Sequence, residues 1–291
     1  MSAREARTHP RAQTKPALEF LGEWGTKGGG PGQLQKPIGL ATDSAGSVYL
    51  TDQGNNFIHK FSALGEPLLS FQDPLVADPG PLAVDSGGAI YVSSRSRIFI
   101  FMPTGERLRE QRRGGGRKLQ EVAGLATDGD GNLFVADTKA NQVVKFDAQG
   151  RLRKVWGKLG TRSGEFHSPF TLAVGADGFV YVIDLDNSRI QKFTREGGFV
   201  SAWVGGDTGG RGLKNPLAIA VNEKFAFVTD SGTLVHVMTL DGLIRHTEDL
   251  SARVKIVPNG RNLTAIALAG KDELLVLDTV RAKVLRFRIN L

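Results

Sequence analysis

The chain has 291 residues, of which 40% are hydrophobic and 23% are charged, and its formal net charge is +7. This apolar content is sufficient for the core of a single all-β domain. The absence of cysteine excludes a disulfide framework, a thiolate nucleophile and a cysteine zinc site. The sequence contains no run of about 18 apolar residues, so it predicts no membrane insertion.

Residues 1–16 are polar and basic, and we expect them to form a disordered tail. Their four basic residues and one acidic residue contribute +3 to the net charge, which leaves +4 for the rest of the chain. They lack the hydrophobic stretch of a signal peptide. A cytoplasmic location is therefore slightly favoured, but the sequence does not fix the compartment.

Residues 17–25, ALEFLGEWG, match the last strand of a unit that recurs along the chain, as a comparison with residues 152–157 and 200–205 indicates. The three tryptophans of the chain share one place in these segments, each 13 residues before a proline: Trp24, Trp156 and Trp203. The last copy of the unit stops one strand short. We therefore expect the first strand to complete that copy and to leave no open sheet edge between the chain ends.

The unit itself recurs six times, with copies that begin near residues 37, 79, 122, 169, 216 and 263. Residues 122–157 show it most clearly. Four short runs of β-branched and aromatic residues alternate there with turns rich in Gly, Asp and Asn, which predicts four β-strands. We name these strands a to d in chain order. Six such units predict an all-β fold, a six-bladed β-propeller with four antiparallel strands in each blade.

Columns of equivalent residues support this alignment. The second residue of the strand-a motif is Leu or Ile in every copy, and the third is always alanine: Ala41, Ala83, Ala126, Ala173, Ala220 and Ala267. Strand b ends in an aspartate in five copies: Asp52, Asp137, Asp184, Asp230 and Asp278. Alanine suits the narrow inner end of a wedge-shaped blade, so we interpret the strand-a columns as core packing.

The repeat resembles the NHL repeat of six-bladed propellers. The family pattern is roughly G-x-F-x-x-P-x-G-I-A-V-D, followed by a strand that ends in V-A-D and then by N-x-R-I-x-x-F. It is visible in residues 164–193, 32–61 and 124–146. The resemblance covers residues 17–291 and implies one propeller domain. It implies no single function, because the family includes protein-binding sensors, RNA-binding domains and a few enzymes.

Propeller topology places the d–a loops and the b–c loops on one side of the ring, which we call the top face. These loops are rich in Lys and Arg, whereas the loops of the opposite face are mostly acidic, and such segregation favours an anionic partner. The cations expected near the upper rim are Lys36, Arg95, Arg97, Lys139, Arg189, Lys214 and Arg281. Alternatively, they are solvated loop charges that pair in part with the strand-b aspartates.

These patterns favour a monomeric, non-catalytic scaffold that binds a protein or an acidic or phosphate-bearing ligand. RNA is a weaker alternative. Residues 112–118 superficially resemble an Arg-Gly RNA-binding segment, but the top loops contain few aromatic residues on which bases could stack.

A second hypothesis is a cation-dependent hydrolase or lyase. The residues just before the strand-a proline position are expected to ring the mouth of the central channel: Lys36, Asp78, Glu121, Ser168, Asn215 and Asn262. Oxygen ligands suit Ca²⁺, so Asp78, Glu121, Asn215 and Asn262 form the candidate metal set. The placement resembles that of gluconolactonase-like propellers, although the E-G-P signature of that family is missing. The scaffold interpretation expects a polar, water-filled mouth and no cofactor.

A zinc lyase similar to the amidating-lyase propellers is disfavoured. That resemblance would imply three converging histidines, and only His167 of the five in the chain falls in the loop before a strand a.

Overall fold

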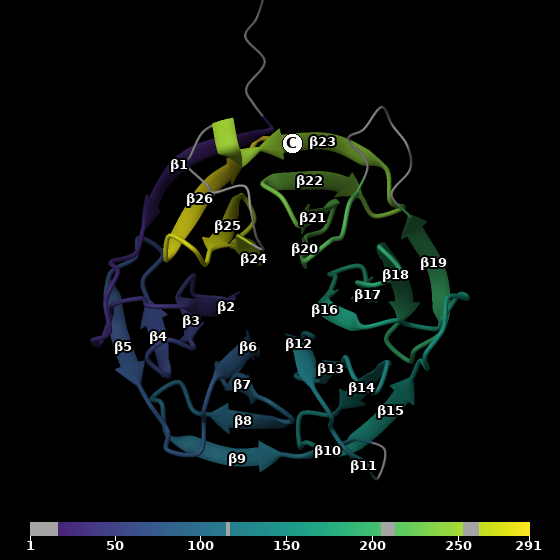
Figure 1. The fold of residues 1–291 in the computed structure, drawn as a ribbon, viewed down its shortest axis with the longest axis horizontal. Coiled ribbons are helices and arrows are strands. Elements are labelled where there is room, and N and C mark those ends of the chain that lie inside the picture. Colours follow the sequence, from purple (N-terminus) through teal and green to yellow (C-terminus); the bar gives the residue numbers. More distant parts are fainter. Residues whose placement is uncertain (1–16, 115–116, 205–212, 253–261) are drawn as a thin grey trace, which may run out of the picture.

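The protein is a ring of six four-stranded antiparallel blades around a central axis (Figure 1). The structure, a computed structural model, describes residues 17–114, 117–204, 213–252 and 262–291. This architecture confirms the predicted six-bladed propeller. The tail expected at residues 1–16 lies outside the described residues. Within the described part of the chain, no helix has the length and apolar character needed to cross a membrane.

Blades 1 to 5 follow the chain from the inner strand to the outer strand, whereas blade 6 takes its outer strand from the N-terminal end of the chain. Blade 1 contains β2 (Pro37–Thr42), β3 (Val48–Asp52), β4 (Phe57–Phe61) and β5 (Pro67–Phe71). Blade 2 contains β6 (Pro79–Val84), β7 (Ile90–Ser94), β8 (Arg97–Phe101) and β9 (Arg107–Gln111). Blade 3 contains β12 (Val122–Thr127), β13 (Leu133–Asp137), β14 (Gln142–Phe146) and β15 (Leu152–Trp156).

The other three blades follow the same order. Blade 4 contains β16 (Pro169–Val174), β17 (Phe179–Asp184), β18 (Arg189–Thr194) and β19 (Phe199–Val204). Blade 5 contains β20 (Ala218–Val221), β21 (Phe225–Thr229), β22 (Leu234–Thr239) and β23 (Ile244–Asp249). Blade 6 contains β24 (Leu263–Ala269), β25 (Glu273–Asp278), β26 (Lys283–Ile289) and β1 (Leu18–Trp24). The short strands β10 (Arg113–Gly114) and β11 (Arg117–Lys118) form a separate ribbon, and a single 3₁₀ turn, η1, spans Leu250–Ala252.

The N-terminal strand closes the ring, as predicted. β1 pairs antiparallel with β26 along its length, so the two ends of the chain share blade 6 (Figure 1). Side chains reinforce this seam: Arg281 Nη2 lies 2.5 Å from Glu23 Oε1, and Lys283 Nζ donates to the Gly25 carbonyl oxygen at 2.6 Å. Pairing both edges in this way leaves no unsatisfied strand between the termini.

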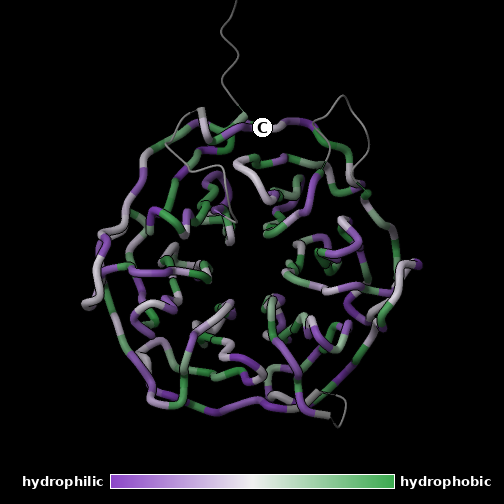
Figure 2. The backbone as a smooth tube through the Cα atoms, viewed as in Figure 1, coloured by the Kyte–Doolittle hydropathy of each residue, from purple (hydrophilic) through white to green (hydrophobic). Residues whose placement is uncertain are grey.

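The hydrophobic core lies between neighbouring blades, and the hydrophobic segments of the strands follow it around the ring (Figure 2). One cluster joins Ala83 and Tyr91 of blade 2 to Leu125 and Val135 of blade 3. The alanine at the narrow end of each blade therefore serves inter-blade packing, as the repeat pattern predicts.

The tryptophans at the ends of the outer strands also connect neighbouring blades. The ring of Trp156 packs under Gly197, which belongs to the c–d turn of blade 4 and has φ of +79°. A Cβ atom at Gly197 would lie only 2.7 Å from Trp156 Cδ2. Gly65 lies over Trp24 and Gly242 over Trp203 in the same manner. Only glycine combines this backbone conformation with so close an approach of the ring.

Candidate functional site

A cavity of about 760 Å³ opens along the central axis. All six inner strands contribute one apolar wall residue from the Leu/Ile column: Leu40, Leu82, Leu125, Leu172, Ile219 and Ile266. The alanine column does not line it, because alternate strand residues point to opposite faces of a sheet. The inner strands thus build a cavity with apolar walls within a usual ligand-pocket size range.

The polar rim of this cavity is formed mainly by blades 1 to 3. Its members lie in d–a or b–c loops: Lys36, Gln53, Asp78, Arg95, Gln120, Glu121 and Lys139. Backbone hydrogen bonds tie the two kinds of loop together, since the Gln53 N–H donates to the Lys36 carbonyl oxygen at 3.0 Å and the Thr138 N–H to that of Glu121 at 2.9 Å. This confirms that the two kinds of loop share the top face.

Aspartates at the end of strand b fix these loops. Asp52 Oδ2 accepts a hydrogen bond from the Gln35 N–H at 2.6 Å, and its Oδ1 accepts one from the Lys36 N–H at 2.8 Å. Asp137 Oδ1 accepts from the Glu121 N–H at 3.0 Å. Both aspartates are fully buried. They cap the loop backbone, so they hold the rim residues in place and are not themselves ligand-binding groups.

The rim charges form two exposed ion pairs and leave one cation unpaired. Arg95 Nη2 lies 3.0 Å from Asp78 Oδ2, and Lys139 Nζ lies 2.8 Å from Glu121 Oε2. The Glu121 contact raises the pKa of Lys139. The side chains of Arg95 and Lys139 are 75% and 67% exposed, so each pair contributes little to stability and can exchange partners. Lys36 is exposed and forms no ion pair within the described residues.

The candidate metal set is only partly brought together. Asp78 and Glu121 line the same cavity, but Asn215 and Asn262 are not among its lining residues. Asn215 Oδ1 accepts a hydrogen bond from Ser188 Oγ at 3.0 Å, and Asn262 is buried. Because each carboxylate already faces a cation, the donor set fits an ion-pair network better than a hard divalent cation. In the described ranges, no cluster of three or more His, Cys, Asp or Glu residues is placed to hold a metal ion.

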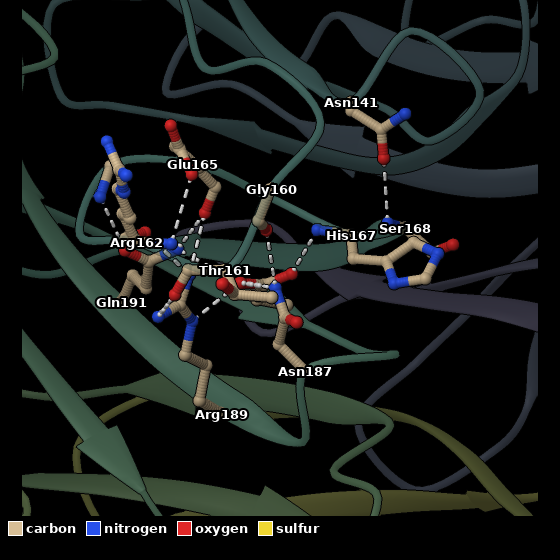
Figure 3. Close-up of polar contacts among 12 residues, drawn as sticks. Asn141, Gly160, Thr161, Arg162, Glu165, His167, Ser168, Asn187, Arg189 and Gln191 are labelled. Carbon is tan, nitrogen blue, oxygen red and sulfur yellow. Dashed lines mark hydrogen bonds and ion pairs between the residues drawn. The ribbon is translucent and has the colours of Figure 1, made fainter.

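Arg189 differs from the expectation that it lies at the upper rim, because it is only 9% exposed. Figure 3 shows its guanidinium group beside Thr161 and Arg162 of the preceding loop. Its Nε donates to Asp184 Oδ2 at 2.7 Å. Its two terminal nitrogens donate to three carbonyl oxygens of the preceding d–a loop, at 2.7 to 2.9 Å, from Thr161, Arg162 and Glu165. The register explains this role: β17 and β18 place Arg189 directly opposite Asp184.

The other three predicted cations lie outside the cavity lining. Arg97 is shared between Glu110, at 3.4 Å, and the Leu75 carbonyl oxygen, at 3.1 Å. Arg281 belongs to the seam of blade 6. Lys214 is exposed and has no ion pair in the described part of the chain. Of the seven predicted cations, Lys36, Arg95 and Lys139 therefore meet at the cavity.

Residues on the top face that sequence reasoning missed are Gln53, Gln120 and Ser93, all of which line the cavity. A signal was available for two of them. Gln53 follows the strand-b aspartate directly, as the rim residue Arg95 follows Ser94, and Gln120 stands just before Glu121. Ser93 gives no such signal, because its equivalents include Thr51 and Ala136, which suggest a plain core column.

No protein-family model matches this sequence. Among curated proteins, protein brain tumor of Drosophila melanogaster is 27% identical over an alignment of 158 positions, which covers 51% of this chain and 15% of that protein. The matched part is thus a small fraction of the relative's length.

Solved structures match over most of the ring. A streptogramin B lyase superposes with a TM-score of 0.65 at 17% identity, covering 94% of this chain and 88% of the lyase chain. A chain from a nidogen/laminin complex gives a TM-score of 0.65 at 22% identity, covering 80% of this chain and 84% of its own. These likenesses establish the fold and leave the function to be argued from the site.

Proposed function

We propose that this chain is a non-catalytic NHL-type propeller that binds an acidic protein or ligand on its top face, centred on the channel mouth. The observation that carries the proposal is the rim of the cavity, where the cations Lys36, Arg95 and Lys139 outnumber the carboxylates Asp78 and Glu121. All three cations are exposed, and their two ion pairs are of the weak surface kind. An anionic partner can therefore replace Asp78 and Glu121 at little cost.

The NHL assignment is supported by the repeat motifs and by the 27% identical segment of protein brain tumor, an NHL-repeat protein. The solved neighbours include a lyase and a propeller from a protein complex, so the fold is compatible with catalysis and with binding. The choice between a catalytic and a binding function rests on the carboxylates of Asp78 and Glu121. A catalytic cation would need these carboxylates free, whereas both face a cation.

The test uses a labelled deca-glutamate peptide, with deca-glutamine as the uncharged control. We expect the charge-reversal variant Lys36→Glu/Arg95→Glu/Lys139→Glu to bind deca-glutamate at least about tenfold more weakly, and the salt dependence of binding to flatten. The matched control is Lys224→Glu/Arg245→Glu/Lys271→Glu, which changes three exposed cations of the opposite face by the same total charge. If both triple variants lose affinity equally, net charge alone is responsible and the top face has no special role.

Calcium distinguishes the enzyme hypothesis. We expect about 5 mM Ca²⁺, a concentration far above a typical site's dissociation constant, to leave the melting temperature unchanged within about 1 °C. A specific calcium site would instead raise the melting temperature, because a ligand in high excess stabilises the folded state. A clear upward shift that disappears in Asp78→Asn would favour the cation-dependent enzyme.

A further inference from the structure

The channel mouth is not symmetric. One column, just inside the rim, varies in size from blade to blade: Ile38, Gly80, Ala123, Phe170, Leu217 and Thr264. The two smallest members, Gly80 and Ala123, belong to blades 2 and 3 and both line the cavity. They lie below the Arg95–Asp78 and Lys139–Glu121 pairs, which come from the same two blades. The smallest residues of this column therefore stand in the two blades whose rim carries both ion pairs.

A buried hydroxyl group lies beside Gly80. Ser93 is 1% exposed and lines the cavity, and its Oγ atom has no hydrogen-bond partner among the residues that the structure describes. Its equivalents are used differently: Thr51 Oγ1 donates to the Gly80 carbonyl oxygen at 2.6 Å, and Thr229 Oγ1 donates to that of Leu263 at 3.0 Å. A buried hydroxyl group without a partner is costly, so an unused donor beside a cavity points to a ligand atom.

Glycine at position 80 keeps this hydroxyl group within reach. A Cβ atom there would lie 2.6 Å from Ser93 Oγ, and any side chain would cover the hydroxyl. We call Gly80, Ser93 and Ala123 the recess. Phe170 of blade 4 also lines the cavity, and the Leu/Ile column continues below the mouth. The channel mouth thus combines a cationic rim with the one hydroxyl donor of the recess. The Leu/Ile column below it forms an apolar section of the channel, which we call the shaft.

We propose that the recess binds a small organic monoanion with an apolar body. Its anionic head lies between the rim cations and the Ser93 hydroxyl group, and its body lies in the shaft against the Leu/Ile column. The excess of one cation over the rim carboxylates matches a single negative charge. This inference rests on the proposed function, because the same rim cations attract the anion, and it adds a ligand class of a size that the cavity holds.

The test compares naphthalene-2-carboxylate with naphthalene-2-carboxamide, which has nearly the same shape but no charge. Titration calorimetry on the full chain should show the carboxylate binding about tenfold more tightly than the amide, as expected for a charge-assisted contact. Equal affinity for the two probes would overturn the proposal.

Variants locate the bound probe. Ala123→Phe fills the recess, and we expect it to abolish binding of both probes. Lys36→Gln and Ser93→Ala should each weaken carboxylate binding by about three- to tenfold. Lys214→Gln is the matched control, since it removes an exposed cation that does not line the cavity, and it should change neither probe. Unchanged binding in Ala123→Phe, with the fold verified by circular dichroism, would place the probe elsewhere and contradict the recess.

The two proposals fail in different ways. Loss of naphthalene-2-carboxylate binding in Ala123→Phe with deca-glutamate binding intact supports the recess and separates it from the wider face. If deca-glutamate binding responds to the rim cations while naphthalene-2-carboxylate never binds, the recess proposal is wrong and the proposed function stands. If neither probe binds the wild-type chain, both are wrong.

Discussion

Two equivalent d–a loops, residues 25–36 and residues 157–168, follow the same path but are fastened differently. Each begins after a strand-d tryptophan and ends just before the strand-a proline. In the first, the Leu34 N–H donates to the Thr26 carbonyl oxygen at 2.8 Å, and in the second the Phe166 N–H donates to that of Lys158 at 2.8 Å. The isolated bridges Lys27–Leu34 and Leu159–Phe166 are equivalent as well.

The difference lies in what holds each loop to its blade. At the second loop, buried Asp184 of β17 accepts hydrogen bonds from the side chains of Asn187, Arg189 and Gln191. Figure 3 labels these three donor residues. In the first, Phe57 takes the place of Arg189 opposite Asp52, and within the described ranges Asp52 accepts only from backbone N–H groups.

The position of Gln191 is also used differently. Gln191 Oε1 accepts directly from the Gly164 N–H at 2.9 Å. At the first loop the link is indirect. His59 Nδ1 lies 2.8 Å from Ser70 Oγ, and this oxygen accepts a hydrogen bond from the N–H of the loop residue Gly32 at 3.0 Å. The Trp–Pro spacing and the strand-b aspartate, which both loops share, therefore determine the loop path. The contacts of Arg189 with Asp184 and the loop carbonyl groups, which we call the arginine clamp, are present only at the second of these two loops.

The largest effect should come from removing that clamp. Arg189→Ala leaves the Asp184 carboxylate buried with fewer partners and frees three loop carbonyls, so it should reduce the free energy of unfolding by about 3–5 kcal/mol. Phe57→Ala, at the equivalent place, removes a partly exposed ring and should cost about 1–2 kcal/mol. Urea denaturation measures both. Similar costs for the two variants would show that the two loops are not fastened differently.

Both loops start after a tryptophan that packs against a glycine of the next blade, and a substitution can disrupt this shared contact. Gly197→Ala forces a Cβ atom against Trp156, at the start of the second loop, and also places alanine at φ of +79°. We expect a loss of about 3 kcal/mol, of which about 1 kcal/mol is the cost of the backbone conformation.

Gly178→Ala is the matched control in the same blade. Its φ is +82°, and the nearest atom to a new Cβ would be 3.7 Å away, so only the backbone cost remains. Equal melting temperatures for the two variants would contradict the role assigned to the Trp156 contact.

His59 of β4, which contacts the first loop through Ser70, gives a pH dependence that Gln191 at the second loop cannot. Burial lowers the pKa of His59 to about 4, from 6.5 in the unfolded chain, although the nearby Asp52 charge opposes this shift. The unfolded chain therefore takes up the proton first, so stability is fully present above pH 6.5 and is lost as the pH falls towards 4. Linkage gives a loss of about 2 kcal/mol at pH 5. His59→Gln should remove this contribution, and an unchanged profile between pH 7 and pH 5 would refute it.

The repeat made the fold predictable, because columns such as the six alanines report packing that every blade shares. The face on which the rim residues lie could be predicted from the sequence, but which of the seven cations line the cavity could not. Topology placed Lys36, Arg95 and Lys139 on the top face, since loop order alone decides which face a residue occupies. Arg189 is instead the first residue of β18, and its burial depends on the strand register opposite Asp184 and on carbonyl groups of the preceding d–a loop. The N-x-R motif of the repeat marks Asn187 and Arg189, but spacing alone does not show which loop carbonyl groups Arg189 binds.

The recess was not predictable for a related reason. Gly80 and Ser93 look like ordinary members of their columns, and they gain significance only from the 2.6 Å separation between a Gly80 Cβ position and the Ser93 hydroxyl oxygen. The proposed site depends on departures at a few positions, whereas sequence columns report what the repeats share.

The smallest expected effect concerns the ends of the two loops, where Lys36 and Ser168 occupy equivalent positions. Lys36→Ser should change the free energy of unfolding by less than about 0.5 kcal/mol, because the side chain is exposed and unpaired in the described residues. It should nevertheless weaken binding of naphthalene-2-carboxylate about threefold in a calorimetric titration. Adding Ser168→Lys should not restore affinity, since Asp186, 2.5 Å from Ser168 Oγ, would pair with the new cation. Full restoration would mean that any cation on the ring suffices, and the two loop ends would then be interchangeable.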